Sequence, residues 1–465
     1  MRSIETDYLV VGAGAAGMAF TDSLVAASGA SVAVVDRRHA PGGHWHDAYP
    51  FVRLHQPSQL YGVNSLPLGN ETIDGDGPNR GLYELAGAPE ICSYYERVMR
   101  EGLLATGRVR YFPMSEYVGR GRFVSRLSGE TTEVKVRKRV VYATYLGPSV
   151  PATAPPPFDV DAGVRCVPVG ELPRLVEHAD GYVVVGAGKT GIDACLWLLE
   201  LGVAPESICW IKPSELWLLN RAYVQVGDLA AGIFEGFSLQ MEAIAEAESV
   251  DDLFLRLEHA GQVLRVDERV TPTVYRGATV TAGEVQALRR IEDVVRLGYV
   301  RRIERDRIVL DGGEIPTSPR RVHVHCAARG LNRAPAVPVY TEDTVTLQWI
   351  LPGFLPFNAA IEGFVEASRA DTGEKNRLCR ATAIVETPED WLRGMLHANK
   401  AAQVWAQEDD LDQWLLSSRL YWRHWVARLG DDPRVAESAR RFGENLVPAF
   451  TNGRQLLAAA AAASA

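Results

Sequence analysis

The sequence contains no closely spaced pair of cysteines. Its six cysteines are scattered along the chain, and none of them belongs to a CxxC or CxxxxC motif. Enzymes that reduce disulfides need two neighbouring thiols, so the sequence argues against this class of enzyme. Scattered single cysteines are typical of a reducing compartment, where they pack as small apolar residues.

An excess of basic residues and a long apolar segment are also missing. The chain carries 49 Lys and Arg against 58 Asp and Glu, whereas a nucleic-acid surface must be basic. Its longest apolar tail, residues 456–465, is about half of the roughly 20 residues that a membrane-spanning helix requires. A strand begins by Asp7, which leaves no room for a signal peptide. We therefore expect a cytoplasmic protein with a small-molecule partner and no nucleic-acid or membrane partner.

Two segments have the pattern of strand, glycine turn, helix and strand. The three elements lie at residues 8–11, 15–28 and 31–35 in the first unit, and at 182–185, 190–201 and 207–211 in the second. Such alternation is typical of doubly wound α/β domains with a parallel sheet. The pair predicts an α/β protein with two Rossmann-like dinucleotide-binding domains.

The rest of the chain contains further expected elements. We predict a helix at residues 89–104, four short strands between 117 and 144, strands at 299–304 and 307–310, and an apolar strand at 322–328. Residues 148–157 contain five prolines, which predicts a linker. From Pro388 onward the pattern is helical and rich in tryptophan, and we expect these large side chains to pack between helices.

A GxGxxG motif, formed by Gly12, Gly14 and Gly17, follows the first strand and opens the first helix. The first glycine permits a tight turn, the second lets the backbone approach a pyrophosphate, and the third lets the helix pack on the strand. Asp36 ends the second strand, where a carboxylate accepts hydrogen bonds from ribose hydroxyls. We predict an FAD site here. The neighbouring residues also assigned to this site are Ala16 and Arg37.

A second GxGxxG motif, formed by Gly186, Gly188 and Gly191, follows the strand expected at 182–185. A phosphate loop for ATP would need a further glycine at position 183, which is valine. The motif therefore predicts a second dinucleotide site. The residues inside the motif that we also assign to it are Lys189 and Thr190.

The second unit has no acid where the first has Asp36. Lys212 ends its second strand, and Arg221 follows nine residues later. A cation at this place suits the 2′-phosphate of NADPH, whereas the free hydroxyl of NADH favours an acid. We predict that Lys212 and Arg221 select NADPH; the alternative is that both are solvated surface charges.

The segment after Asp36 resembles the flavin-wrapping segment of the flavin-containing monooxygenase superfamily, the class B enzymes that depend on FAD and NADPH. The resemblance rests on Gly42-Gly43-His44-Trp45, Tyr49-Pro50 and Leu54-His55-Gln56-Pro57-Ser58. It extends to Ala143-Thr144 and Cys326-Ala327-Ala328-Arg329-Gly330, which are similar to the two linkers of that superfamily. The similar parts are about residues 5–60, 140–215 and 320–367, and the C-terminal helices have no counterpart.

This resemblance implies a discontinuous FAD lobe with the NADPH lobe inserted into it. We accordingly expect four parts: residues 1–155 for the first part of the FAD domain, 156–330 for the NADPH domain with an insertion, 331–387 for the second part of the FAD domain, and 388–465 for a helical region. It also implies further cofactor contacts, at Gly43, His44, Trp45, Thr144 and Arg329.

Three positions depart from the superfamily. Tyr145 replaces the glycine of its Ala-Thr-Gly linker, the FxGxxxHxxx fingerprint is absent after Phe158, and Gln56 stands where amine oxygenases carry asparagine. We predict that Gln56 or His55 forms a hydrogen bond over the flavin ring, where a polar group steadies an oxygenated flavin or orients substrate. A plain structural histidine is the alternative for His55.

Several histidines crowd residues 39–55, but zinc needs three or four converging ligands and this loop already wraps the flavin, so we predict no metal.

The leading function is an FAD- and NADPH-dependent monooxygenase that passes one oxygen atom of O2, through a flavin peroxide, to a small organic substrate in an N-, S- or Baeyer-Villiger-type reaction. The alternatives are a flavin dehydrogenase or oxidase and a non-catalytic flavoprotein. A homodimer is left open.

Overall fold

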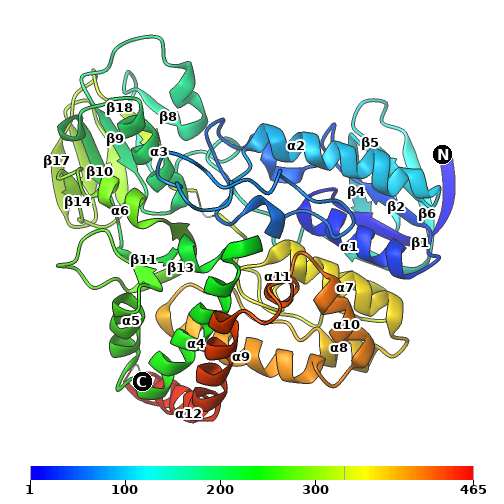
Figure 1. Ribbon diagram of the computed structural model, residues 1–465. Coiled ribbons are helices and arrows are strands. Elements are labelled where there is room, and N and C mark those ends of the chain that lie inside the picture. The colour runs from blue at the N-terminus through cyan, green and yellow to red at the C-terminus, as the bar shows by residue number, and fades with distance from the viewer. Residues whose placement is uncertain (1, 329, 464–465) are drawn as a thin grey trace.

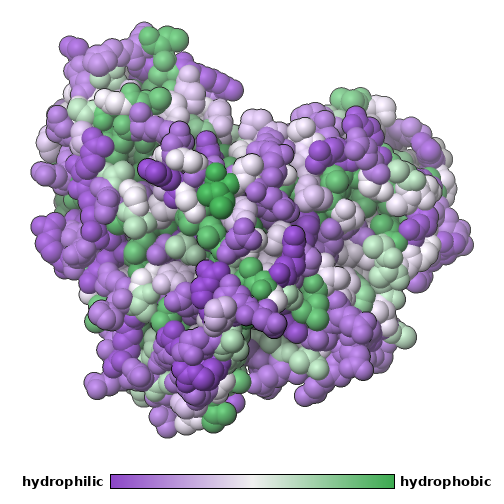
Figure 2. Space-filling model, viewed as in Figure 1, coloured by the Kyte–Doolittle hydropathy of each residue, from purple (hydrophilic) through white to green (hydrophobic). Residues whose placement is uncertain are grey.

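The computed structural model describes residues 2–328 and 330–463 of the 465-residue chain. Two lobes with largely parallel sheets lie side by side, and a layer of helices runs below both of them (Figure 1). Residues 2–142 and 344–378 contribute to one lobe, and most of residues 159–325 form the other. The outer faces are mainly hydrophilic, and hydrophobic side chains gather where the lobes meet (Figure 2).

The first lobe is built on a seven-stranded sheet with the order β3-β2-β1-β6-β5-β4 and with β19 also paired to β6. Its strands are β1 (Arg2–Val11), β2 (Val32–Val35), β3 (Val109–Phe112), β4 (Ser115–Gly119), β5 (Arg122–Ser125), β6 (Thr131–Tyr142) and β19 (Thr344–Thr346). β1 pairs in parallel with β2 and with β6. Leu9 and Val10 are fully buried, because a central parallel strand is covered on both faces.

Helices from both ends of the chain cover this sheet. They are α1 (Ala15–Ala27), α2 (Ala88–Arg97), α7 (Leu355–Ser368) and α8 (Thr372–Leu378). α1 and α7 approach closely, because Gly363 has no side chain: a Cβ there would lie 2.5 Å from the carbonyl oxygen of Phe20. The Tyr8 hydroxyl donates to Glu366 at 2.8 Å. The segment after residue 330 is thus part of the first lobe.

The second lobe contains a five-stranded parallel sheet with the order β14-β10-β9-β18-β8. Its strands are β8 (Cys166–Pro168), β9 (Tyr182–Val185), β10 (Ile208–Ile211), β14 (Val294–Val295) and β18 (Val322–His325). α3 (Lys189–Glu200) and α6 (Ala282–Leu288) pack on one face. A four-stranded sheet packs on the other face; it comprises β7 (Asp159–Val160), β15 (Val300–Ile303), β16 (Arg307–Leu310) and β17 (Gly313–Pro316).

An insertion follows β10, and its helices form the helical layer together with the helices at the C-terminus. It comprises β11 (Leu216–Asn220), α4 (Ala231–Glu246), α5 (Val250–His259), β12 (Val263–Leu264) and β13 (Val274–Val280). The final helices are α9 (Pro388–Trp405), α10 (Asp409–Ser417), α11 (Trp422–Ala427) and α12 (Pro433–Ala463), and α12 runs along α4. Trp391, Trp405 and Trp425 are buried, as expected for packing residues. Within the described residues, a helix with the length and apolarity of a membrane span is not found.

The predicted α/β class with two Rossmann-like units is confirmed, and most predicted elements appear within a few residues. One exception is the segment 117–144, where three strands replace the four expected. β6 continues without a break to Tyr142 and leaves the antiparallel meander to pair in parallel with β1. β6 therefore belongs both to the antiparallel meander, through β5, and to the parallel part of the sheet, through β1. The proline-rich segment contains no helix in its described residues.

Candidate functional site

The first glycine turn connects β1 to α1. Gly12 has a φ of 111°, and a Cβ there would lie 2.9 Å from Cγ2 of Thr144. A Cβ on Gly17 would lie 2.0 Å from the Gly12 carbonyl oxygen. No side chain caps the amino end of α1, so its first N–H groups have no side-chain acceptor. Thr144 lies beside this turn, and the contact of both with a cofactor stays a prediction.

Asp36 holds the first turn from the end of β2. It is 5% exposed, and its two carboxylate oxygens accept hydrogen bonds from the backbone N–H groups of Ala13 at 2.6 Å and Arg38 at 2.7 Å. Each carboxylate oxygen can accept more than one hydrogen bond, so these contacts are compatible with a ribose hydroxyl. The side chain of Arg37 is exposed, whereas Arg38 forms an ion pair with Asp47.

The segment with the Gly-Gly-His-Trp motif lies directly on this turn. The Gly42 N–H donates to the Ala13 carbonyl at 2.9 Å, and a Cβ on Gly43 would lie 2.9 Å from Cα of Gly14. Trp45 donates through its indole to the Tyr61 hydroxyl at 2.7 Å. Burial, and then the positive charge of Arg38, lower the pKa of His44 to about 4. The predicted residues Gly14, Gly43, His44 and Trp45 thus come together, and Ala16 lies in the first turn of α1.

The second glycine turn connects β9 to α3 in the same way. Gly186 has a φ of 136°, and a Cβ on Gly191 would lie 2.1 Å from the Gly186 carbonyl oxygen. A Cβ on Gly188 would meet nothing within 4 Å, so the backbone is open to a ligand at that point. Lys189 and Thr190 begin α3, whose amino end also has no side-chain cap. Lys189 pairs with Asp193 on the next turn.

Lys212 directly follows β10, at the place that corresponds to Asp36 after β2. It is 2% exposed, lies 4.5 Å above the Trp210 ring and forms an ion pair with Glu215. Burial lowers the pKa of Lys212, and Glu215 acts in the opposite direction. Glu215 also accepts from Arg296 at 2.7 Å. That Lys212 binds the 2′-phosphate of NADPH stays a prediction. Its ammonium group is buried and already paired with Glu215.

The predicted position of Arg221 on the cofactor surface is corrected by the structure. This side chain is 0% exposed. Its guanidinium donates to the carbonyl oxygen of His55 at 3.0 Å and to the side-chain oxygen of Asn79 at 3.0 Å, and it forms an ion pair with Glu284 at 3.0 Å. A guanidinium enclosed by protein acceptors has no surface for a phosphate. Arg221 therefore fastens the loop at His55 to the second lobe.

One loop connects the two glycine turns. The segment that places Gly43 on the first turn reaches the second lobe a few residues later, where the Tyr49 hydroxyl donates to Asp193 of α3 at 2.6 Å. Phe51 stacks on Trp197 of the same helix, with ring centroids 4.6 Å apart. Sequence reasoning marked Tyr49 only as part of a motif and missed Phe51, Trp197 and Asp193, because the partners are far apart in sequence.

His55 and Gln56 end this loop, and both are partly exposed. Burial, followed by the positive charges of Lys189 and Arg221, lowers the pKa of His55 to about 3. His55 is therefore neutral at physiological pH and lies on the side of the second turn.

Arg329 lies outside the described residues, so its predicted contact has no structural account. Within residues 2–328 and 330–463, no group of three or more His, Cys, Asp or Glu side chains is arranged to hold a metal ion.

Comparison with known proteins identifies relatives of nearly the whole chain. A family model described as NAD(P)-binding Rossmann-like domain matches residues 10–62, which contain the first glycine turn. Uncharacterized proteins of Mycobacterium bovis and Mycobacterium tuberculosis are 49% identical over 439 residues, which cover 94% of this chain and 81% of each relative. The chain belongs to the family of these mycobacterial proteins.

Solved structures share parts of the chain path at low identity. A flavin-containing monooxygenase from Stenotrophomonas maltophilia is 15% identical, with a TM-score of 0.44 over 82% of this chain and 100% of that one. A cyclohexanone monooxygenase from Rhodococcus sp. Phi1 bound to NADP+ is 16% identical, with a TM-score of 0.47 over 81% of this chain and 85% of that one.

Proposed function

We propose that the protein is an FAD- and NADPH-dependent oxidoreductase, and that it acts as a monooxygenase on a small organic substrate in an N-, S- or Baeyer-Villiger-type reaction. The observation that carries the proposal is the loop of residues 42–56, which packs on the first glycine turn at Gly43 and on the helix of the second at Tyr49 and Phe51. One loop that contacts both turns supports two dinucleotides bound in neighbouring sites, as hydride transfer between them requires.

The first turn fits FAD. Gly12, Gly14 and Gly17 would receive the pyrophosphate against the uncapped amino end of α1, and Asp36 would accept from the ribose. When bound, FAD supplies the redox chemistry: it accepts a hydride from NADPH and, once reduced, reacts with O2. Gly43, His44 and Trp45 would close the loop over it. His44 is neutral because its pKa is held near 4, so it contributes a hydrogen bond and no charge.

The second turn fits a nicotinamide dinucleotide, and its open side at Gly188 leaves room for the pyrophosphate. The NADPH preference rests on the cations at the end of β10. Lys212 and Arg296 share Glu215, and Arg296 also pairs with Asp267 at 2.9 Å. A 2′-phosphate would be a further anionic partner for the guanidinium of Arg296, whereas an unphosphorylated ribose offers no anion. Arg296, which is partly exposed, replaces Arg221 in this proposal.

His55 and Gln56 would position the substrate between the lobes. A neutral His55 offers a hydrogen bond without drawing water to a charge, and exclusion of water favours oxygen transfer over wasteful release of hydrogen peroxide. Tyr49 and Phe51 would keep this segment packed on α3 during the reaction. We also propose a cytoplasmic location, with a small-molecule substrate and O2 as partners; a homodimer is left open.

A stopped-flow experiment tests the proposed reaction. The protein is reduced anaerobically with NADPH and mixed with O2 while the flavin spectrum is recorded. A monooxygenase passes through a transient species with its own near-ultraviolet absorbance, and bound NADP+ prolongs its lifetime. Gln56→Ala or His55→Ala should shorten that lifetime. Reoxidation in one step with complete release of hydrogen peroxide would overturn the monooxygenase reading in favour of an oxidase, and failure of NADPH to bleach the flavin would favour a non-catalytic flavoprotein.

A further inference from the structure

The hydroxyl of Tyr49 bonds to the part of α3 that receives the nicotinamide cofactor under the proposed function. It donates to one carboxylate oxygen of Asp193 at 2.6 Å, and the other carboxylate oxygen forms an ion pair with Lys189. Thr190 forms a further side-chain hydrogen bond to the same hydroxyl. Lys189 and Thr190 begin α3 and are assigned above to that cofactor. One carboxylate thus binds both a residue of the flavin loop and a residue of the second glycine turn.

Tyr49 remains a hydrogen-bond donor at physiological pH. The side chain is 9% exposed, and burial, followed by the negative charge of Asp193, raises its pKa well above the ordinary value. The ring also contacts Phe51, with centroids 4.9 Å apart, and Phe51 stacks on Trp197 of α3. To leave α3, the loop has to break the bond to Asp193 and separate these rings.

The opposite end of the loop is packed on the first glycine turn. The Gly42 N–H donates to the Ala13 carbonyl at 2.9 Å, and a Cβ on Gly43 would lie 2.9 Å from Cα of Gly14. Under the proposed function this end closes over FAD, so FAD leaves when the loop opens. A stronger attachment at Tyr49 should then slow FAD release, because coupling between sites is carried by packed side chains and hydrogen bonds.

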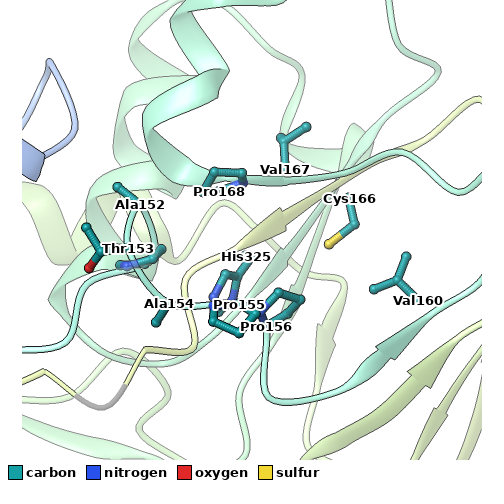
Figure 3. Close-up of a pocket in the computed structure, with 11 residues that line it drawn as sticks. Ala152, Thr153, Ala154, Pro155, Pro156, Val160, Cys166, Val167, Pro168 and His325 are labelled. Atoms are coloured by element: carbon teal, nitrogen blue, oxygen red, sulfur yellow. The ribbon is translucent and has the colours of Figure 1, made fainter.

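The proline-rich linker, which also connects the lobes, is packed less closely. Its residues 151–156 share with Cys166 and His325 of the second lobe the lining of a cavity of about 480 Å³ (Figure 3). A segment that borders a cavity loses van der Waals contacts on that side. A shift in one lobe therefore displaces the other less through this linker than through the loop of residues 42–56.

A dinucleotide at the second turn would change the partner of Lys189. This side chain is 12% exposed, and it begins α3 where no side chain caps the helix. A pyrophosphate at this amino end carries more negative charge than one carboxylate, so Lys189 would turn to it. Asp193 would then be a free carboxylate. A hydrogen bond to a free carboxylate is stronger than one to a carboxylate whose charge is already paired.

We propose that Tyr49 and Asp193 couple the two cofactor sites, so that a dinucleotide at the second turn strengthens the binding of FAD at the first and slows its release. Both are positioning residues, because they act through the loop of residues 42–56. The inference rests on the proposed function, since it requires both cofactors. By thermodynamic reciprocity, bound FAD also raises the affinity for the dinucleotide.

The rate of FAD release from the holoprotein tests this coupling. The holoprotein is diluted, and the rise in flavin fluorescence is followed with and without saturating NADP+. A second probe, 2′-phospho-ADP-ribose, keeps the pyrophosphate but lacks the nicotinamide ring, so it does not stack on the flavin. Both probes should slow FAD release about 3-fold to 10-fold, which is the gain expected when the acceptor of one hydrogen bond becomes a free carboxylate.

Three variants separate the coupling from a purely structural role. Tyr49→Phe keeps the ring but loses the hydroxyl, so the probes should change its FAD release by less than about 2-fold. Lys189→Met should release FAD more slowly than the unmodified protein even without a probe, because Asp193 is already free; a purely structural ion pair predicts faster release. Tyr145→Phe is the matched control and should respond fully, because its hydroxyl donates to the Pro335 carbonyl at 2.8 Å, at the other connection between the lobes.

The coupling would be overturned if both probes bind the unmodified protein and leave FAD release unchanged, or if a folded Tyr49→Phe variant keeps the full response. An effect of NADP+ without an effect of 2′-phospho-ADP-ribose would also contradict it, because the nicotinamide ring would then be responsible. A purified protein without FAD, or no binding of either probe in calorimetry, would contradict the proposed function itself. The comparison of the probes uses the unmodified protein, so it decides the matter even where a variant fails to fold.

Discussion

A single methyl group added to one glycine turn should weaken cofactor binding at that turn and leave binding at the other turn unchanged. In Gly17→Ala the new Cβ would lie 2.0 Å from the Gly12 carbonyl oxygen, and in Gly191→Ala it would lie 2.1 Å from that of Gly186. Both distances are more than 1 Å shorter than an ordinary contact of roughly 3.4 Å, so the helix must move away from its strand. Overpacking of this kind costs about 1 to 3 kcal/mol.

If the cofactor binds only the undistorted turn, that free energy appears in its affinity. Each 1.4 kcal/mol is tenfold, so Kd should rise about 5-fold to 150-fold. Gly17→Ala should therefore lose FAD and its yellow colour. Gly191→Ala should remain yellow but require much more NADPH to bleach its flavin. The two substitutions change the same residue type at corresponding positions, so each is a control for the other.

The assay is flavin absorbance of the purified variants, followed by anaerobic titration with NADPH. Gly29→Ala, at the end of α1, is the neutral control because its Cβ would meet nothing within 4 Å. The assignment of two separate sites would be refuted by a Gly191→Ala variant that loses FAD, or by a folded Gly17→Ala variant that keeps it at full occupancy.

Four further outcomes follow from charged residues. Asp36→Ala should weaken FAD binding by about 1 to 3 kcal/mol, measured by flavin release, because the Ala13 N–H loses its acceptor. Lys212→Ala and Arg296→Ala should each raise KM for NADPH with little change for NADH; equal effects on both cofactors would make these cations structural. Arg221→Ala should lower the free energy of unfolding by about 3 to 5 kcal/mol, since it leaves buried acceptors unpaired, without changing cofactor preference. The pKa of His55 falls from 6.5 unfolded to about 3 folded, so its contribution to stability should be complete above pH 6.5 and be lost as pH falls toward 3; His55→Gln should remove this dependence in denaturant titrations.

Local patterns were enough to predict the two strand-turn-helix units. Their glycines act within a few residues of one another, and the structure places Gly12 beside Gly17 and Gly186 beside Gly191 as the motif requires. The position of Asp36 after the second strand was predictable for the same reason, but its bond to the Ala13 N–H was not expected, and its contact with ribose stays a prediction. The placement of Thr144 followed from family resemblance, and β6 delivers it to the turn because that strand pairs with β1.

The contacts that join the lobes could not be predicted in this way. Tyr49 finds Asp193 at a separation of 144 residues, and Arg221 finds the loop at His55 at a separation of 166 residues. Charge alone suggested a phosphate ligand for Arg221, but periodicity gives no sign that the insertion after β10 folds this residue into the interior. Arg296 was missed because it follows β14, which pairs with β10, and lies 81 residues from Glu215 in a part of the sequence without a motif. The domain boundaries stay a prediction.

The two turns show how one fold holds two dinucleotide sites with opposite charge at the same place. In the first turn, Asp36 accepts a hydrogen bond from the Ala13 N–H and so stabilises the turn. In the second, Lys212 cannot accept, and the Trp210 indole instead donates to the Gly186 carbonyl at 2.9 Å. Because the indole holds the turn, position 212 does not need to accept a hydrogen bond from it. Under the proposed function, the charge there can then follow the nicotinamide cofactor, and Lys212, paired with Glu215, would favour NADPH.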